Sequence, residues 1–147
     1  MVLAILVDLD TAYVAVEPGA TPLPLTLAVG LRLPAWSTAT GRALLSAHPP
    51  ERVATMHRHG VPESPRGRPF RLDEVVAAVD TARRLGHASN TESGEMDLAG
   101  TAALVHGPDG PVAAVGVISS LADAERRLAT DIVLVRELAD RLTSAVC

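Results

Sequence analysis

Residues 86–120 read G-H-A-S-N-T-E-S-G-E-M-D-L-A-G-T-A-A-L-V-H-G-P-D-G-P-V-A-A-V-G-V-I-S-S, and the rest of the chain is best understood around them. Two apolar runs, 101–106 and 111–119, flank the turn residues Gly-Pro-Asp-Gly at 107–110. An Asp-Gly pair between two such runs predicts a β-hairpin. Because both runs are continuously apolar, we expect other elements to cover both faces of this sheet. The polar segment 90–97 before the hairpin predicts a loop, and loops on a rigid scaffold often carry function.

The N-terminal quarter of the chain predicts more strands. The runs 2–8 and 11–17 are rich in β-forming residues and indicate a first hairpin. Residues 23–29 alternate apolar and smaller or polar side chains, which predicts a third strand, although Pro24 restricts part of it to a sheet edge. Residues 30–34 are expected to be a connector.

Helical signals occupy the middle and the end of the chain. Ser37 or Thr38 can cap a helix over 39–47, and a second short helix is expected from Pro49-Pro50 to a stop at Gly60. Residues 61–71 have no period and predict a loop. Helical spacing of apolar residues predicts helices over 72–85, ended by Gly86, and over 122–146. The apolar stripe from Leu128 to Val146 is interpreted as core, with a subunit interface as the alternative.

This order of elements predicts the fold class. Three strands, helices, three strands and a last helix indicate an α+β fold with a mostly antiparallel sheet of about six strands and flanking helices. The length of 147 residues predicts one domain.

Composition excludes several classes of protein. The net charge is −4 and only 2% of residues are aromatic, which argues against direct nucleic-acid binding. The single cysteine, Cys147, rules out a disulfide within the chain, as is usual in a reducing compartment. Neither a long apolar run nor a signal peptide is found. We therefore expect a cytoplasmic protein with no membrane contact.

Three segments of the chain resemble a known family. Leu-Pro-Ala-Trp-Ser-Thr-Ala-Thr-Gly-Arg-Ala-Leu-Leu at 33–45 is similar to the L-P-x-x-x-T/S-A-x-G-K-A-x-L motif of the effector-binding domain of IclR-type bacterial transcription regulators. Arg-Arg-Leu-Gly-His-Ala at 83–88 is similar to that family's R-x-x-G-Y-A. The apolar runs at 102–105 and 112–117 are similar to its A-A-P-V hairpin and A-A-L-S-V-S strand. The three segments have the family's order and spacing and frame nearly the whole chain.

The resemblance implies a GAF/PAS-like fold and a non-enzymatic ligand sensor without a cofactor. It implies a small organic acid or aromatic metabolite as effector and a homo-dimer or tetramer. The family's winged helix-turn-helix, which binds DNA, has no counterpart in the chain, so we expect residues 1–147 to be a single effector-binding domain that does not contact DNA itself. The ligand-binding residues carried over by position are Ala39, Thr40, Asn90, Leu98, Gly100, Gly116 and Ile118.

The chain departs from the family pattern at several of these positions. It has Asn-Thr-Glu-Ser at 90–93 where the family frequently has acidic residues, and Gly100, Gly116 and Ile118 where the family often has hydroxyl or thiol side chains. These changes remove polar anchors and predict a more apolar or differently shaped pocket. The alternative hypothesis is therefore a stand-alone dimerisation or assembly module of the same fold, whose pocket has closed.

The sequence gives little support for an anion site, a metal site or a catalytic site. The start of the helix at 38–41 could bind a carboxylate or could be an ordinary cap. Glu92, Glu95 and Asp97 lack the ligand density of a calcium loop and are interpreted as a solvated acidic loop. His57 and His59 have poor metal-binding spacing and predict an exposed helix end. No nucleophile–base or paired-carboxylate pattern occurs, so neither a metal site nor catalysis is expected.

Overall fold

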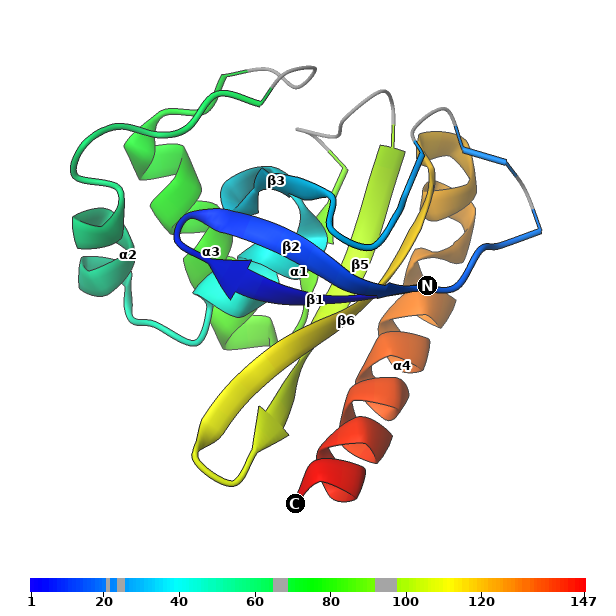
Figure 1. Ribbon diagram of the computed structural model, residues 1–147. Helices are drawn as coiled ribbons and strands as arrows, with labels where there is room; N and C mark the ends of the chain where they lie inside the picture. Colours follow the sequence, from blue (N-terminus) through cyan, green and yellow to red (C-terminus); the bar gives the residue numbers. More distant parts are fainter. Residues whose placement is uncertain (21, 24–25, 65–68, 92–97) are drawn as a thin grey trace.

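The fold is built around one six-stranded sheet with the strand order β3-β2-β1-β6-β5-β4, in which all neighbouring strands pair antiparallel (Figure 1). The computed structural model describes residues 1–20, 22–23, 26–64, 69–91 and 98–147. The strands are β1 (Val2–Val7), β2 (Asp10–Val16), β3 (Arg32–Pro34), β4 (Ala88–Asn90), β5 (Leu98–Gly107) and β6 (Gly110–Ser120). The helices are the 3₁₀ turn η1 (Ala35–Ser37), α1 (Ala39–Leu45), α2 (Pro50–Met56), α3 (Leu72–Leu85) and α4 (Leu121–Val146). The predicted α+β class with a six-stranded antiparallel sheet is confirmed.

The hairpin predicted around Asp109-Gly110 is present and longer than expected. It is formed by β5 and β6, and its turn places Gly110 at a φ of 124°, where a side chain would be strained. The second strand of this hairpin also pairs with the first strand of the chain, with Val2 opposite Gly116. This pairing joins the N-terminal and C-terminal halves into one sheet.

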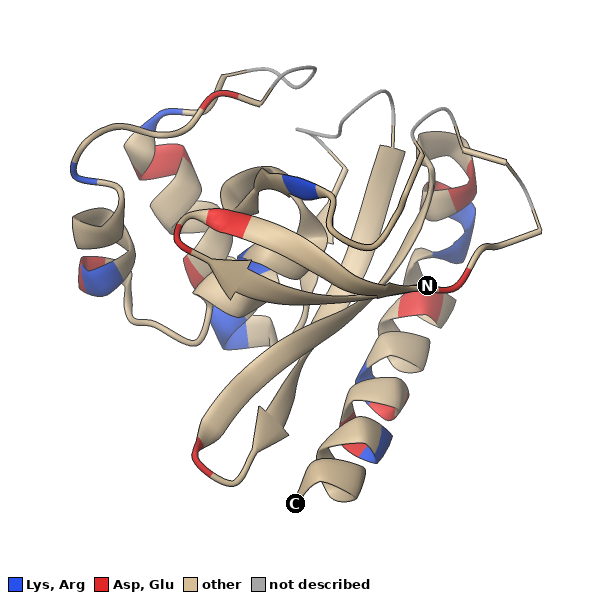
Figure 2. Ribbon diagram, viewed as in Figure 1, with Lys and Arg blue, Asp and Glu red and all other residues tan. Residues whose placement is uncertain are grey.

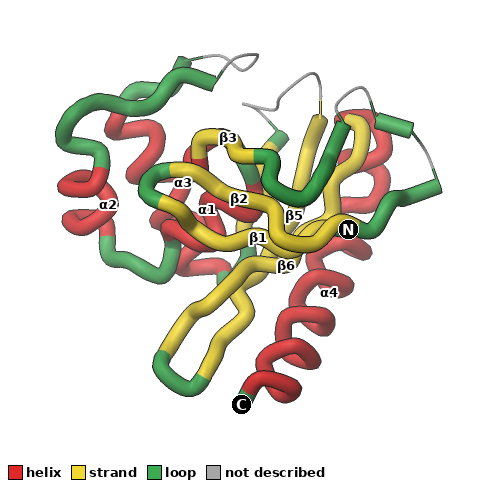
Figure 3. Tube along the Cα trace, in the orientation of Figure 1, coloured by secondary structure: helices red, strands yellow, loops and turns green. Residues whose placement is uncertain are grey.

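Helices cover both faces of the sheet, as the apolar runs predict. The long helix α4 lies along β5 and β6 on one face, and α1 packs on the other face (Figures 1 and 3). Under α4 the buried cluster is Ala103, Val105, Ala113, Val115, Val135 and Ala139. Under α1 alanines dominate, among them Ala4, Ala39, Ala43, Ala102 and Ala114, together with Tyr13. Small side chains let the helices approach the sheet closely.

The apolar stripe of α4 is core in its middle and exposed near both ends. Val135 is fully buried, whereas Leu128 and Val146 are 36% and 51% exposed. The core interpretation is therefore confirmed for the middle of the helix. Among the described residues, no helix is both long and apolar enough to cross a bilayer.

A separate apolar cluster holds α2 and α3 beside η1. It contains Trp36, Leu45, Val53, Phe70, Val75 and Val79. The ring of Trp36 stacks on Phe70 with centroids 4.8 Å apart, and its Nε1–H donates to the carbonyl of Pro62 at 2.6 Å. The only tryptophan and the only phenylalanine of the chain therefore meet in one place.

Two predicted boundaries are wrong. The third strand is Arg32–Pro34, not 23–29: residues 26–28 belong to no strand, and residues 21 and 24–25 lie outside the described residues. The strand forms at 32–34 because these residues pair with β2, where Arg32 also makes a 3.0 Å ion pair with Asp10. The second short helix ends at Met56, before the expected stop at Gly60.

The prediction of an exposed end for this helix is also wrong for His57, which is 1% exposed. His57 follows the buried Val53 by four residues, so both side chains lie on the inner face of the helical turn. Its Nδ1 lies 2.8 Å from the Val53 carbonyl and donates to it, whereas Nε2 is buried without a partner among the described residues. His59 is exposed, as expected.

Candidate ligand-binding site

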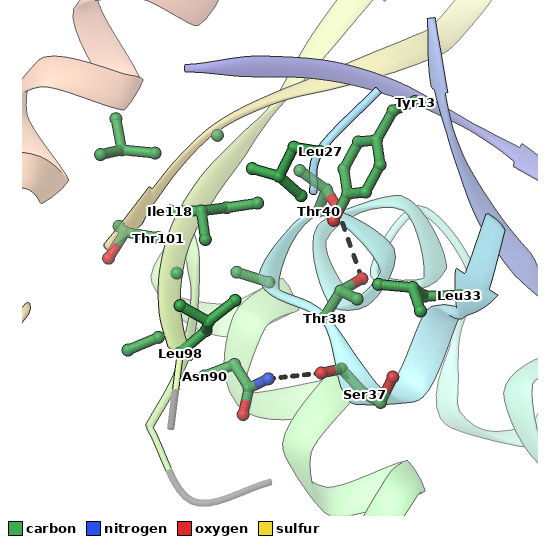
Figure 4. A pocket seen from close by; sticks show the side chains of 15 residues that line it. Tyr13, Leu27, Leu33, Ser37, Thr38, Thr40, Asn90, Leu98, Thr101 and Ile118 are labelled. Carbon is green, nitrogen blue, oxygen red and sulfur yellow. Dashed lines mark hydrogen bonds between the residues drawn. The ribbon is translucent and has the colours of Figure 1, made fainter. Parts of the chain in front are cut away.

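All seven residues carried over by the family resemblance line one cavity between α1 and the inner face of the sheet (Figure 4). Ala39 and Thr40 come from α1, Asn90 from β4, Leu98 and Gly100 from β5, and Gly116 and Ile118 from β6. Asn90 was expected in a loop, but it is the last residue of a strand and pairs with Gly100. The other lining residues are Tyr13, Leu27, Leu33, Ser37, Thr38, Ala99, Thr101 and Val117.

The start of α1 is closed by its own cap. Thr38 Oγ1 accepts a hydrogen bond from the backbone N–H of Gly41 at 2.9 Å, and the Thr38 carbonyl accepts one from Arg42. The predicted cap at 38–41 is therefore present, and a carboxylate beside this helix start stays a prediction. Whatever binds beside α1 meets side chains rather than the N–H of Gly41.

Buried hydroxyl groups form a chain on the cavity wall. Thr40 Oγ1 lies 3.2 Å from Thr11 Oγ1 and donates to Thr38 Oγ1 at 3.4 Å. Across the cavity, the Asn90 side-chain amide donates to the carbonyl of Ser37 (Figure 4). These residues are all at most 7% exposed, so their polar groups are held in fixed positions inside an apolar site.

A buried guanidinium lies behind this wall and fixes β4 to α1. Arg42 is 2% exposed, and its Nε donates to the Trp36 carbonyl at 2.8 Å. Its Nη1 donates to the Ser89 carbonyl at 3.3 Å, and the group stands 5.4 Å from the ring centre of Phe70. Asn90 is therefore positioned through its neighbour in β4 as well as through its own amide.

Two glycines let α1 approach the sheet within van der Waals contact. A Cβ added to Gly116 would stand 2.8 Å from Thr40 Cγ2, and one added to Gly100 would stand 3.2 Å from Ala39 Cβ. The family resemblance implies larger polar side chains at these two positions in other members. Here the space that such side chains would occupy is taken by α1 itself.

The cavity is consequently small. Its volume is about 40 Å³, enough for very few water molecules. For comparison, a cavity that binds benzene measures about 150 Å³. An aromatic ligand can enter only if side chains such as Leu27 and Ile118 move aside.

We predict that Gly116→Ala destabilises the protein by about 1–2 kcal/mol, because the new methyl group meets the methyl group of Thr40. Thr40→Ser removes that methyl group and should rescue the variant, with a coupling energy of about 1 kcal/mol in a double-mutant cycle. Urea denaturation of the wild type, the two single variants and the double variant measures this coupling energy. Additive effects of the two substitutions would show that Thr40 and Gly116 are not in contact.

Sequence reasoning missed about half of the cavity lining. Tyr13 and Thr101 could have been suspected, because each lies on a strand flanking a predicted hairpin and each is polar in an apolar run. Leu27 could not, because it belongs to a segment without regular structure that was expected to be a strand. The proposed acidic group Glu92, Glu95 and Asp97 lies outside the described residues, and the described ranges contain no cluster of three potential metal ligands.

Comparison with known proteins adds family evidence to this geometry. The family described as bacterial transcriptional regulator IclR C-terminal matches residues 1–143. No curated protein sequence matches the chain.

Solved structures are similar over nearly the whole chain. A protein assigned as a transcriptional regulator from Rhodococcus sp. RHA1 matches with a TM-score of 0.85 and 27% identity, covering 99% of this chain and 61% of that one. An IclR homologue from Microbacterium hydrocarbonoxydans complexed with 4-hydroxybenzoate matches with a TM-score of 0.84, 19% identity and coverage of 99% and 59%. A double mutant of the PobR inducer-binding domain from Acinetobacter, in complex with 3-hydroxybenzoic acid, matches with a TM-score of 0.78 and 21% identity. This match covers 97% of this chain and 85% of that one. The chain thus spans about three fifths of the first two proteins.

Proposed function

Because the chain belongs to the family of C-terminal domains of IclR-type bacterial transcriptional regulators, we propose that it binds the effector of such a regulator in the cavity beside α1. Domains of this family are parts of transcriptional regulators and are not enzymes. We assign effector binding to residues 1–147 as one domain. The net charge of −4 supports the further proposal that these residues do not themselves bind nucleic acid.

One observation carries the proposal: fixed polar groups face an otherwise apolar, buried cavity. The hydroxyl groups of Thr38 and Thr40 and the amide of Asn90 converge on walls made by Leu98 and Ile118. Small-molecule sites typically have this form, with a few placed polar groups in an apolar enclosure.

The proposed effector is a small aromatic or organic acid. Thr40 can exchange its contacts with Thr11 and Thr38 for hydrogen bonds to a carboxylate, and the leucine and isoleucine side chains suit a ring or short carbon chain. The two neighbours solved with hydroxybenzoates support this class. Because the cavity measures only about 40 Å³, binding must displace a side chain. Leu27 is the best candidate, since it lies on a segment outside any helix or strand.

We predict that 3- or 4-hydroxybenzoate, or a related acid in a small panel, raises the melting temperature. Binding at a hundredfold excess over Kd stabilises the native state by about 2.7 kcal/mol, or about 5–10 °C for a domain of this size. Ile118→Ala should strengthen binding by enlarging the cavity, and Thr40→Val should weaken it about tenfold by removing a hydrogen bond. Calorimetric titration of the wild type, Ile118→Ala and Thr40→Val with the acid that raises the melting temperature most measures these changes in affinity.

Matched controls are available on the same elements. Val112→Ala truncates an apolar side chain that is 49% exposed on β6, and it should leave binding unchanged. The proposal would be contradicted if no acid in the panel shifts the melting temperature of either the wild type or Ile118→Ala. It would also be contradicted if Thr40→Val and Val112→Ala had equal effects.

A second candidate function is supported by the small cavity and by exposed apolar side chains. Ile5 and Val14 on β1 and β2 are 36% and 41% exposed, and Val133 on α4 is 56% exposed. Such side chains suit a surface that another copy of the chain covers, as in a homo-dimer or tetramer. Sedimentation velocity tests this. A stable oligomer together with a flat ligand screen would favour an assembly module, and a monomer would contradict it.

A further inference from the structure

A second cavity lies away from the proposed effector site and shares no lining residue with it. It measures about 320 Å³ and is bounded by the C-terminal ends of α1 and α3, by β5 and by α4. This volume is within the range of about 300–1,000 Å³ that is usual for ligand sites. Its walls carry five ionisable side chains, namely Arg83, His87, His106, Arg136 and Asp140.

Two arginines in this cavity have no carboxylate partner among the described residues. Basic residues occur at the C-terminal end of α3 and along α4 (Figure 2), and several of them are paired, as Arg84 is with Asp80 and Arg127 with Asp131, both at 3.3 Å. Arg83 and Arg136, in contrast, make no salt bridge with any of the described residues. Each guanidinium therefore keeps a planar set of donors that matches an oxyanion.

His87 adds a further ionisable group beside Arg136. His87 Nδ1 is buried and makes no hydrogen bond within the described part of the chain. Burial lowers the pKa of His87, the nearby Arg136 lowers it further, and the Leu85 carbonyl acts in the opposite direction. An anion in the cavity would cancel the repulsion from Arg136 and favour the charged imidazole. The remaining ionisable groups that line the cavity are Arg83, His106 and Asp140.

We propose that this cavity is a binding site for a phosphate group, held by Arg83 and Arg136 from two different helices. The two guanidinium groups attract a phosphate dianion, and the carboxylate of Asp140 in the same cavity offsets part of their charge. The carboxylate of Asp140 selects the ligand further, because it can accept a hydrogen bond from a protonated phosphate oxygen and repels an anion that carries no proton. Inorganic phosphate keeps at least one proton near neutral pH, whereas sulfate carries none.

Calorimetric titration with inorganic phosphate, at constant ionic strength and near neutral pH, tests the site directly. The wild type should bind saturably, and Arg83→Gln and Arg136→Gln should each weaken binding at least about tenfold by removing a charge-assisted hydrogen bond. Arg141→Gln is the matched control, because this arginine lies on α4 but does not line the cavity. In NMR titration of the wild type, phosphate should raise the pKa of His87.

Titrations with sulfate and with glycerol phosphate test which anion the cavity prefers. Sulfate should bind more weakly than phosphate to the wild type, and Asp140→Asn should reduce that difference. Glycerol phosphate, titrated below about pH 6 where the ester also keeps a proton, distinguishes two sources of the phosphate group. Tighter binding than inorganic phosphate at the same pH indicates a phosphate ester, and weaker binding indicates the free anion. Absence of saturation with either phosphate ligand, equal binding of sulfate and phosphate, or equal weakening by Arg141→Gln would overturn the proposal. These results do not depend on the outcome with hydroxybenzoates.

Discussion

Gly41→Ala is expected to abolish folding or to remove most of the stability of the domain. A Cβ at this position would stand 2.1 Å from the carbonyl oxygen of Ala35 and 2.4 Å from its Cα. Both atoms belong to the backbone of η1, so no side-chain rotation can relieve the contact. Overpacking in a core costs about 1–3 kcal/mol even when side chains can adjust, and domains are stable by only about 5–15 kcal/mol. Urea denaturation followed by circular dichroism measures the loss.

Gly19→Ala is the control for this substitution. Apart from Gly19 itself and its two chain neighbours, no atom of the described residues lies within 4 Å of a Cβ built on Gly19, so the stability of the Gly19→Ala variant should differ from that of the wild type by less than about 0.5 kcal/mol. If Gly41→Ala were as stable as Gly19→Ala, then η1 and α1 could not be packed as described. The arrangement of Thr38 and Thr40 beside the sheet would then also be wrong.

Trp36→Ala is expected to cost about 3–5 kcal/mol, as is typical of a large aromatic side chain removed from a core. Trp36 is 1% exposed, stacks on Phe70 and donates to the carbonyl of Pro62. Its removal leaves an empty space between η1, α2 and α3 together with an unpaired carbonyl group. Because Trp36 is the only tryptophan, unfolding of the variant must be followed by circular dichroism and not by fluorescence.

A graded series separates the ring from its hydrogen bond. Trp36→Phe keeps an aromatic ring against Phe70 but loses the donor, so it should cost less than the alanine variant. Val133→Ala, at a side chain that is 56% exposed on α4, should be nearly neutral. A loss below about 1 kcal/mol for Trp36→Ala would contradict the burial described for this cluster.

Elements with strong local signals were predictable from the sequence. The hairpin at Asp109-Gly110 and the helix over 72–85 that ends at Gly86 depend on turn chemistry and periodicity, which neighbouring residues alone specify. The segment 23–29 has an alternating pattern, yet the strand forms at Arg32–Pro34. Here the partner strand decides, because pairing with β2 and the ion pair to Asp10 are properties of the folded chain.

The residues that line the cavity beside α1 were predictable only through family resemblance. Position in a motif located Thr40, Asn90 and Gly116, which are up to 76 residues apart (116 − 40). The size of the cavity was not predictable, because it depends on how closely Thr40 approaches Gly116 in the folded protein. The cavity lined by Arg83 and Arg136 was not predictable from the sequence, since these residues come from separate helices and line one cavity only in the fold.

The pairing of β1 with β6 has a consequence for the order of events during folding. Val2 meets Gly116, so the contact closes a loop of 114 residues (116 − 2). During synthesis the edge of β1 that pairs with β6 must stay uncovered until β6 has been made. Long-range pairing of this kind slows folding and exposes strand edges to wrong partners.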